Sequence, residues 1–347
     1  MEKRVDMRVA IYYSNSDVRI EEMPLPDIGP DELLVKVHAS GICGSDVMEW
    51  YRIKKAPRVL GHEITGEIVG VGEKVDDYKL GQRVFVSHHV PCDTCKFCNS
   101  GHTSVCDTLR ATNFDPGGFA EYIRVPSINV EKGVFLLPDE MTYDEGVFIE
   151  PLACVVRGQG FLDVRPEQTV LVIGSGLSGL LHIKLARSKG VKNIIATDIS
   201  EYRLEAAKMA GAKTVLTAEE LTKDTICDVN HGHLADRVIV CAGVETAMKQ
   251  ALDCVDRGGK ILLFAPLEPE KVLPLPVWDM WKNEISITTS YAACSGDIEE
   301  AIDLISRDLV VEEMITHRLP LEETGRGFEL TAGGTGSLKV IIKPHHG

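Results

Sequence analysis

The fold of the central part of this chain is decided by the stretch Thr169-Val170-Leu171-Val172-Ile173-Gly174-Ser175-Gly176-Leu177-Ser178-Gly179. Its first five residues predict a buried strand, and the residues after the turn predict a helix as far as Lys189. Gly174, Gly176 and Gly179 fit the pattern G-x-G-x-x-G at that turn. Such glycines permit a tight turn, let the backbone approach a pyrophosphate and let the helix pack closely on the strand. The stretch therefore predicts a dinucleotide-binding turn, with a structural glycine turn as the alternative.

Asp198 supports the dinucleotide interpretation. It lies 24 residues after Gly174, at the end of the next predicted strand. A carboxylate there accepts hydrogen bonds from both adenosine ribose hydroxyls. It also repels a 2′-phosphate, which favours NAD over NADP. The alternative, a solvated aspartate at a strand end, does not account for the coincidence of strand, turn, helix and spacing.

The pattern around this stretch predicts two kinds of domain. Downstream, predicted strands at 193–197, 214–216, 237–240, 260–264 and 285–289 alternate with helices, which indicates a parallel, doubly wound sheet. Upstream, the first 150 residues carry short apolar runs separated by turn residues, which indicates a barrel-like β domain. A final helix at 297–307 and a strand at 339–342 have no place in a six-stranded sheet, so we expect this tail to return to the first domain.

Composition excludes several classes of partner. The 347 residues include 52 acidic and 37 basic side chains, for a net charge of −15, which opposes binding to nucleic acid. The most apolar stretch, 170–183, has only 14 residues and is broken by glycines, so no membrane span is predicted. The first residues mix charges and lead into no apolar signal core. These features predict a cytoplasmic protein.

Four cysteines fall within 15 residues, at Cys92, Cys95, Cys98 and Cys106. Four thiolates at this short spacing are typical of a closed, tetrahedral structural zinc site. An iron–sulfur cluster is the competing metal interpretation, and unliganded thiols are the alternative without a metal.

The segment Gly61-His62-Glu63-x2-Gly66-x5-Gly72, the four-cysteine lobe and the glycine turn occur in an order that resembles the zinc-dependent medium-chain alcohol dehydrogenase family. The resemblance covers essentially the whole chain and is strongest to the branch of sorbitol and threonine dehydrogenases. It implies a GroES-like β-barrel catalytic domain at 1–152 and 292–347, with a structural zinc lobe at about 91–107. A Rossmann NAD-binding domain at 153–291 lies between these parts. Relatives of this kind are homodimers or homotetramers.

The resemblance also implies the site residues. Cys43 and His62 would bind a catalytic zinc, Glu63 and Glu150 compete for the third protein position, and Ser45 would take the alcohol proton. Arg203 would lie beside the adenosine. Without the resemblance, Ser45 is equally a turn serine and Arg203 a solvated helix charge. The nicotinamide end would be lined by Phe264, Ala265, Pro266, Thr288, Thr289 and Ser290.

The function implied is the reversible oxidation of a secondary alcohol (a diol, polyol, cyclic or amino alcohol) to a ketone, through a zinc-bound alkoxide and hydride transfer to NAD. The partner would be a small alcohol or ketone, with two zinc ions per chain. Two alternatives stay open. One is a zinc-independent enone or quinone reductase of the same superfamily, and the other is a non-catalytic protein that binds zinc and NAD.

Three positions depart from the family's pattern. Met48 stands where relatives commonly carry a histidine of the proton relay, and Glu49 and Ser290 replace the tyrosine and arginine that meet a polyol in the sorbitol branch. A carboxylate at position 49 predicts a neutral or cationic substrate, unless Glu49 is a surface charge. His88 and His89 either line the substrate cleft or are structural.

Overall fold

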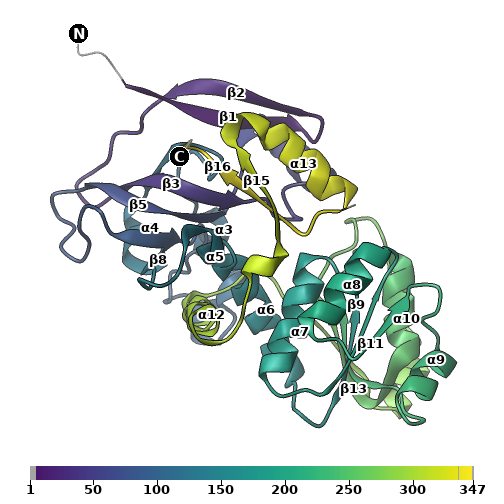
Figure 1. Cartoon of the computed structure of the whole chain (residues 1–347). Coiled ribbons are helices and arrows are strands. Elements are labelled where there is room, and N and C mark those ends of the chain that lie inside the picture. Colours follow the sequence, from purple (N-terminus) through teal and green to yellow (C-terminus); the bar gives the residue numbers. More distant parts are fainter. Residues whose placement is uncertain (1–4, 335, 346–347) are drawn as a thin grey trace. The chain divides into compact units, whose positions relative to one another are not determined.

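Residues 5–334 and 336–345 are described by a computed structural model, in which the chain forms two units (Figure 1). The first unit comprises residues 1–153 and 292–347, and the second comprises residues 154–291. Among the described residues, the helices are too short or too polar to cross a lipid bilayer.

The second unit is built on a six-stranded parallel sheet in the order β11-β10-β9-β12-β13-β14. Its strands are β9 (Thr169–Ile173), β10 (Asn193–Asp198), β11 (Thr214–Thr217), β12 (Ala235–Val240), β13 (Val255–Leu263) and β14 (Ser286–Thr289). The helices are α7 (Leu177–Ser188), α8 (Glu201–Ala210), α9 (Lys223–Val229), α10 (Glu245–Cys254) and α11 (Val277–Lys282). Helices cover both faces of the sheet (Figure 1), which is why the central strand β9 is buried along its whole length. The prediction of a doubly wound parallel sheet is confirmed.

The first unit is β-rich and contains two sheets. A three-stranded sheet has the order β2-β1-β4, from β1 (Asp6–Ser14), β2 (Asp17–Pro24) and β4 (Arg58–Val59). A seven-stranded sheet has the order β15-β16-β3-β5-β6-β8, with β7 also paired to β3. Its strands are β3 (Leu33–Gly41), β5 (Glu63–Val71), β6 (Arg83–Val86), β7 (Tyr122–Val125), β8 (Val134–Leu136), β15 (Ile315–Pro320) and β16 (Lys339–Lys343). Alternate side chains of β3, from Leu33 to Val37, are fully buried, which is the period expected of a strand with one face on a core.

The C-terminal tail contributes to the seven-stranded sheet. Its helices are α12 (Ser295–Arg307) and α13 (Thr324–Gly333), and β16 pairs antiparallel with β3, with Ile341 opposite Gly41. Lys339, the first residue of β16, is thereby brought close to the end of β3.

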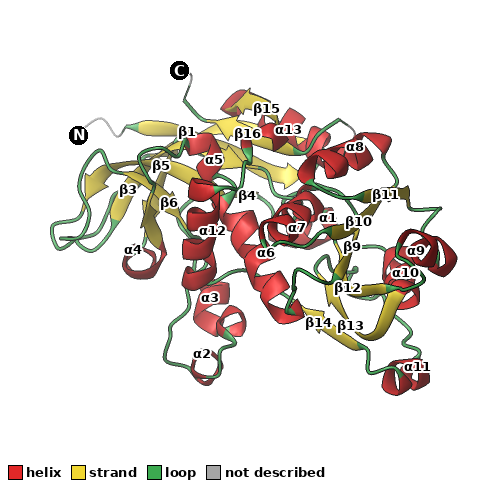
Figure 2. Ribbon diagram, turned by 60° about the horizontal axis from the view of Figure 1, so that its bottom comes forward, coloured by secondary structure: helices red, strands yellow, loops and turns green. Residues whose placement is uncertain are grey.

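Short helices surround this sheet: α1 (Glu49–Arg52), α4 (Ser127–Gly133), α5 (Tyr143–Gly146) and the start of α6 (Ile149–Leu162). The cysteine lobe is a separate projection made of α2 (Lys96–Asn99) and α3 (Asp107–Ala111) with the loops around them (Figure 2). Its other regular structure is a 3-10 turn at Thr103–Val105.

Candidate zinc and dinucleotide sites

The pairing of β3 with β5 brings the predicted catalytic residues together. Gly41 at the end of β3 lies opposite Glu63 at the start of β5. Cys43 follows β3 by two residues and His62 immediately precedes β5, so both side chains reach the same point beyond the strand pair. The sheet register therefore places residues that are about twenty positions apart in the sequence around one centre.

The ligand atoms of Cys43, His62 and Glu63 all lie within 4.8 Å of one another. One thiolate, one imidazole and one carboxylate form the donor set of a catalytic zinc site, which keeps a fourth position for water or substrate. Glu63 is fully buried, and its Oε1 has no hydrogen-bond partner among the described residues. A buried carboxylate oxygen without a partner is costly unless a cation binds it, so these residues fit a zinc ion. Glu150, the second residue of α6, does not belong to this group of three.

Asp46 fixes the orientation of His62. Its Oδ1 lies 3.4 Å from His62 Nδ1, and its Oδ2 accepts a hydrogen bond from the Cys43 backbone N–H at 3.1 Å. Burial opposes ionisation of Asp46, but His62 and Arg52 outweigh it and lower the pKa of this carboxyl. A charged carboxylate on Nδ1 leaves Nε2 free for a metal, which is the usual arrangement around a zinc-bound histidine.

Arg52 holds Ser45 through two hydrogen bonds. Its Nη2 donates to Ser45 Oγ and its Nε donates to the Ser45 carbonyl, each at 2.9 Å. The same Nη2 lies 3.3 Å from Asp46 Oδ1. The Ser45 N–H in turn points at Cys43 Sγ, at 3.4 Å. Ser45 is thus fixed next to the three candidate ligands and keeps its own proton and one lone pair for a substrate hydroxyl.

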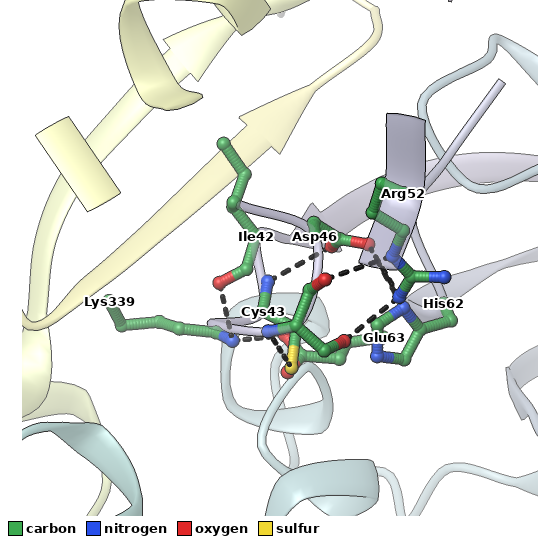
Figure 3. A network of polar contacts seen from close by, with 8 residues as sticks. Ile42, Cys43, Asp46, Arg52, His62, Glu63 and Lys339 are labelled. Carbon is green, nitrogen blue, oxygen red and sulfur yellow. Dashed lines mark hydrogen bonds and ion pairs between the residues drawn. The ribbon is translucent and has the colours of Figure 1, made fainter. Parts of the chain in front are cut away.

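Lys339 holds the second oxygen of Glu63. The two side chains are fully buried and form an ion pair through Glu63 Oε2, and Lys339 Nζ also donates to the Ile42 carbonyl at 3.3 Å (Figure 3). A Cβ at position 41 would collide with Glu63 Oε2 and with the Lys339 side chain, so only glycine leaves room for the pair. The lysine compensates the buried carboxylate and directs its other oxygen towards Cys43 and His62.

The four lobe cysteines also converge. All four Sγ atoms lie within 4.8 Å of one another, and the pairs Cys95–Cys98 and Cys92–Cys106 are 3.6 Å apart. Tetrahedral zinc with Zn–S bonds of about 2.3 Å requires sulfur separations of about 3.8 Å. N–H groups and the hydroxyl of the Thr94–Cys95 turn lower the pKa of Cys92 to about 5, which favours the thiolate. This set fits a closed structural zinc site.

The glycine turn has the geometry that the sequence predicts. Gly174 has φ +93°, Gly176 precedes α7, and a Cβ at Gly179 would collide with the Gly174 carbonyl. Asp198 ends β10 beside this turn and is 6% exposed. Its Oδ2 accepts the Ser175 N–H at 2.7 Å and its Oδ1 accepts the Ser200 N–H at 2.9 Å. The carboxylate is thus fixed at the turn, with lone pairs left for ribose hydroxyls.

The remaining predicted cofactor residues lie at the carboxyl edge of the same sheet. The Arg203 guanidinium is 3.9 Å from a Cβ built at Gly176, and its Nε is buried without a partner among the described residues. Phe264, Ala265 and Pro266 follow β13, and Thr288, Thr289 and Ser290 lie at the end of the neighbouring strand β14. Ligands of open parallel sheets bind at this edge, so these positions fit a dinucleotide.

Sequence reasoning did not identify Asp46, Arg52 and Lys339. Asp46 stands three residues after Cys43, and a lone lysine begins the apolar strand β16, but neither signal is specific. His88 has its ring centroid 4.8 Å from that of His62, and burial lowers its pKa well below the usual value, so it packs beside the site as a neutral side chain. Glu49 is exposed and accepts the Asn15 N–H at 3.1 Å, which favours its interpretation as a surface charge.

Two family descriptions match this chain. Residues 29–139 match the alcohol dehydrogenase GroES-like domain, and residues 179–307 match the zinc-binding dehydrogenases. The first match contains Cys43, His62, Glu63 and the cysteine lobe, and the second begins at Gly179 of the glycine turn.

Relatives and solved structures agree with these matches. A sorbitol dehydrogenase of Bacillus subtilis (strain 168) is 32% identical over 98% of both chains. A putative zinc-binding dehydrogenase from Sinorhizobium meliloti 1021, bound to NADP, superposes with a TM-score of 0.88 at 28% identity, covering 98% of this chain and 100% of that one. A dehydrogenase from Escherichia coli CFT073, complexed with NADH, gives a TM-score of 0.87 at 28% identity, covering 97% and 99%. The chain belongs to the zinc-dependent medium-chain alcohol dehydrogenase family, in the branch of the sorbitol dehydrogenases, and is an NAD-dependent zinc enzyme of that family.

Proposed function

We propose that this dehydrogenase reversibly oxidises a secondary alcohol to a ketone, with Cys43, His62 and Glu63 as the protein ligands of the catalytic zinc. The observation that carries the proposal is the convergence of these three ligand atoms within 4.8 Å, with Ser45 fixed beside them. Glu150 is left without a role as ligand, because Glu63 already supplies the carboxylate of the set.

Zinc supplies a Lewis acid that lowers the pKa of the substrate hydroxyl, and NAD supplies the hydride acceptor. The protein's own side chains accept the proton of the alcohol. Ser45 Oγ has a lone pair to accept the proton of the alcohol, and Arg52 keeps this oxygen in place. Met48 carries no base and Arg52 only donates hydrogen bonds, so neither side chain can take the proton from Ser45. Water, or a ribose hydroxyl of a bound cofactor, would be the acceptor in place of a histidine.

Asp198 supports NAD rather than NADP as the cofactor. Its carboxylate is held by two backbone N–H groups at the glycine turn. A 2′-phosphate there would be repelled by this negative charge, whereas two ribose hydroxyls would be accepted. Arg203 would then stack beside the adenosine.

The two alternatives are less well supported. A zinc-independent reductase needs neither the three candidate ligands of the catalytic zinc nor the four lobe cysteines, yet the first unit brings both groups together. A non-catalytic binding protein has no need for a serine hydroxyl fixed next to a candidate metal position. Neither alternative accounts for Ser45.

We further infer a homodimer or homotetramer. Trp278 and Trp281 of α11 are 68% and 72% exposed, and β14 is the outermost strand of its sheet. Large exposed aromatic side chains and an open strand edge each favour association. All ten cysteines lie within the described residues and none is in a disulfide, which is the state expected in the reducing cytoplasm.

The experiment is NADH formation from sorbitol, 2,3-butanediol, cyclohexanol and 1-amino-2-propanol, with the wild type and with Ser45→Ala. We expect turnover of at least one secondary alcohol, and a loss of about 100-fold or more in kcat for S45A. Bound zinc and NAD with no NADH from any of the four alcohols would contradict the proposal. Full activity in S45A would contradict the role of Ser45.

A further inference from the structure

His88 packs directly against one of the candidate zinc ligands. Its ring centroid lies 4.8 Å from that of His62, and the two rings are inclined by 52°. His89 packs on the same ring, with 3.8 Å between the centroids. Phe114 adds an edge contact at 6.5 Å. The imidazole of His88 is therefore held beside the proposed reaction centre by three other rings.

The backbone that carries His88 is also fixed. Asn129, which is fully buried, donates from Nδ2 to the Ser87 carbonyl at 2.9 Å and to the His88 carbonyl at 3.2 Å. Two residues further along, the Val90 N–H donates to Thr112 Oγ1 at 3.0 Å. A side chain on such a fixed segment does not have to be ordered when a ligand binds, which favours a role in recognition.

The polar atoms of His88 are not used by the fold. Nδ1 is buried and has no partner among the described residues. Nε2 also has no partner among them, but it is not buried, because the half-buried side chain leaves this edge of the ring accessible. An imidazole without hydrogen bonds stabilises a fold no better than a phenyl ring of similar shape. The accessible nitrogen of His88 is therefore available to a ligand.

The buried nitrogen decides where the proton of this ring lies. A neutral imidazole carries its proton on one nitrogen and accepts a hydrogen bond at the other. A proton on Nδ1 would leave a buried N–H without an acceptor, whereas a proton on Nε2 can be bound by water or by a ligand. We therefore place the proton on Nε2, which makes the accessible edge of His88 a hydrogen-bond donor.

We propose that His88 is a specificity-determining residue whose Nε2 donates a hydrogen bond to a second oxygen of the substrate, on a carbon adjacent to the reacting one. The inference rests on the proposed function and narrows its substrates to diols, polyols and hydroxyketones. His88 would supply the contact that the sorbitol branch makes with a tyrosine and an arginine, which are Glu49 and Ser290 in this chain. Of the two interpretations that the sequence leaves open for His88, the structure thus favours the one in contact with substrate.

The kinetic test compares 2,3-butanediol with 2-butanol, which lacks the second oxygen, in the wild type, His88→Phe and His88→Gln. We expect H88F to lower the ratio of kcat/KM for the diol over 2-butanol by about three- to tenfold, the effect of one neutral hydrogen bond. H88Q keeps an N–H donor and should retain more of the ratio. The control is His233→Phe at a 75% exposed position of the second unit, which should leave the ratio unchanged. An unchanged ratio in H88F would overturn the inference.

Thermal unfolding separates recognition from a structural role. Because no described residue forms a hydrogen bond with the His88 ring, a phenyl ring should pack in its place, and H88F should have the melting temperature of the wild type. A melting temperature of H88F well below that of the wild type would show that folding needs the imidazole, and it would overturn the inference.

Binding in the presence of NADH separates this inference from the proposed function, because NADH cannot accept a hydride from an alcohol. The zinc-loaded protein with bound NADH is titrated with 2,3-butanediol and with 2-butanol, and NADH fluorescence is followed. The wild type should bind the diol more tightly, and H88F should reduce this preference by about three- to tenfold.

The two possible failures differ in this experiment. A wild type that binds the diol no more tightly than 2-butanol would overturn the inference, even if both alcohols are oxidised. A preference for the diol that depends on His88, without turnover of any alcohol, would instead contradict the proposed function.

Discussion

Glu63 and Lys339 are 276 positions apart in the sequence, yet both are fully buried and paired at the end of β3. A buried carboxylate without a counter-charge is strongly destabilising. Two cations would compensate the charge of Glu63: Lys339 at one oxygen and, when it is bound, zinc near the other. Lys339 is thus a positioning residue, because it orients Glu63, one of the three candidate zinc ligands.

Replacing Lys339 by Met should therefore destabilise the protein more without zinc than with it. With the catalytic zinc removed, we expect a loss of about 3 kcal/mol or more in the free energy of unfolding, because Glu63 is left unpaired. The measurement is urea unfolding of zinc-loaded and chelator-treated protein. Lys343→Met is the matched control, because Lys343 is 34% exposed and its ion pair with Asp144 should contribute less than about 1 kcal/mol. Equal losses in K339M and K343M would count against the buried pair.

Asp198 is a second single residue with a testable role, because we expect it to select NAD over NADP. Asp198→Ala should weaken NAD binding by about tenfold or more and raise relative binding of NADP, because both the hydrogen bonds to ribose and the repulsion of a 2′-phosphate are lost. Fluorescence titration with NADH and NADPH measures both affinities. Glu219→Ala, which removes an exposed carboxylate of the same unit, is the control. An unchanged ratio of NADH to NADPH affinity in D198A would show that another residue selects the cofactor.

The sequence predicted some of these residues and not others, for a physical reason. The glycine turn and the cysteine cluster are contiguous patterns whose spacing reflects their chemistry. Cys43 and His62 were found only through a resemblance, because their proximity depends on the register of β3 with β5. Lys339 and Arg52 carry no pattern, since a single charged residue shows its role only when packing supplies its partner.

The cysteine lobe is the element whose fold depends most on a ligand. Its two helices have four and five residues, too short to be stable alone. Lys132 ties the lobe to α4 by donating to the Cys92 carbonyl at 3.3 Å and to Asp93 at 2.6 Å. A bound zinc would supply the remaining cross-links.

Cys95→Ser should accordingly lose one zinc per chain and lower the melting temperature, with a smaller effect on kcat per folded molecule. Elemental analysis and thermal unfolding measure the two losses. Cys227→Ser, on α9 and outside both clusters, should leave zinc content and melting temperature unchanged. A C95S protein that loses one zinc but has the melting temperature of the wild type would show that the zinc does not stabilise the lobe.

Strands were predicted well where burial is complete or nearly complete, as in β9, β10 and β12. The hairpin of β1 and β2 was not predicted, because β2 has no buried residue, carries four charged side chains and is held by its pairing with β1. The two-residue strand β4 likewise has no signal of its own. These elements depend on partner strands rather than on their own composition.

At the scale of the whole molecule, the predicted combination of a GroES-like domain with a doubly wound sheet is confirmed by the three sheets and by both family matches. The substrate could not be predicted, because the side chains that would bind it come from several loops and their contacts are set by packing.

Association is tested through α11. Trp278 and Trp281 have ring centroids 5.4 Å apart and are largely exposed, so we expect Trp281→Glu to shift the protein from dimer or tetramer towards smaller species in sedimentation velocity. Met209→Glu, at a 75% exposed position on α8, should leave sedimentation unchanged. A wild type that sediments as a monomer, or a W281E protein identical to it, would contradict the proposed association.

The central claim is that Cys43, His62 and Glu63 form a zinc site required for hydride transfer and separate from the cysteine lobe. The most direct test compares the wild type with Cys43→Ser. For each protein, zinc per chain is measured together with NADH affinity and the rate of NADH formation. The account predicts two zinc ions and turnover in the wild type, and in C43S one tightly held zinc, unchanged NADH binding and a loss of turnover. A C43S enzyme that retains two zinc ions and wild-type turnover, or a wild type that oxidises alcohols with only the lobe zinc present, would contradict it.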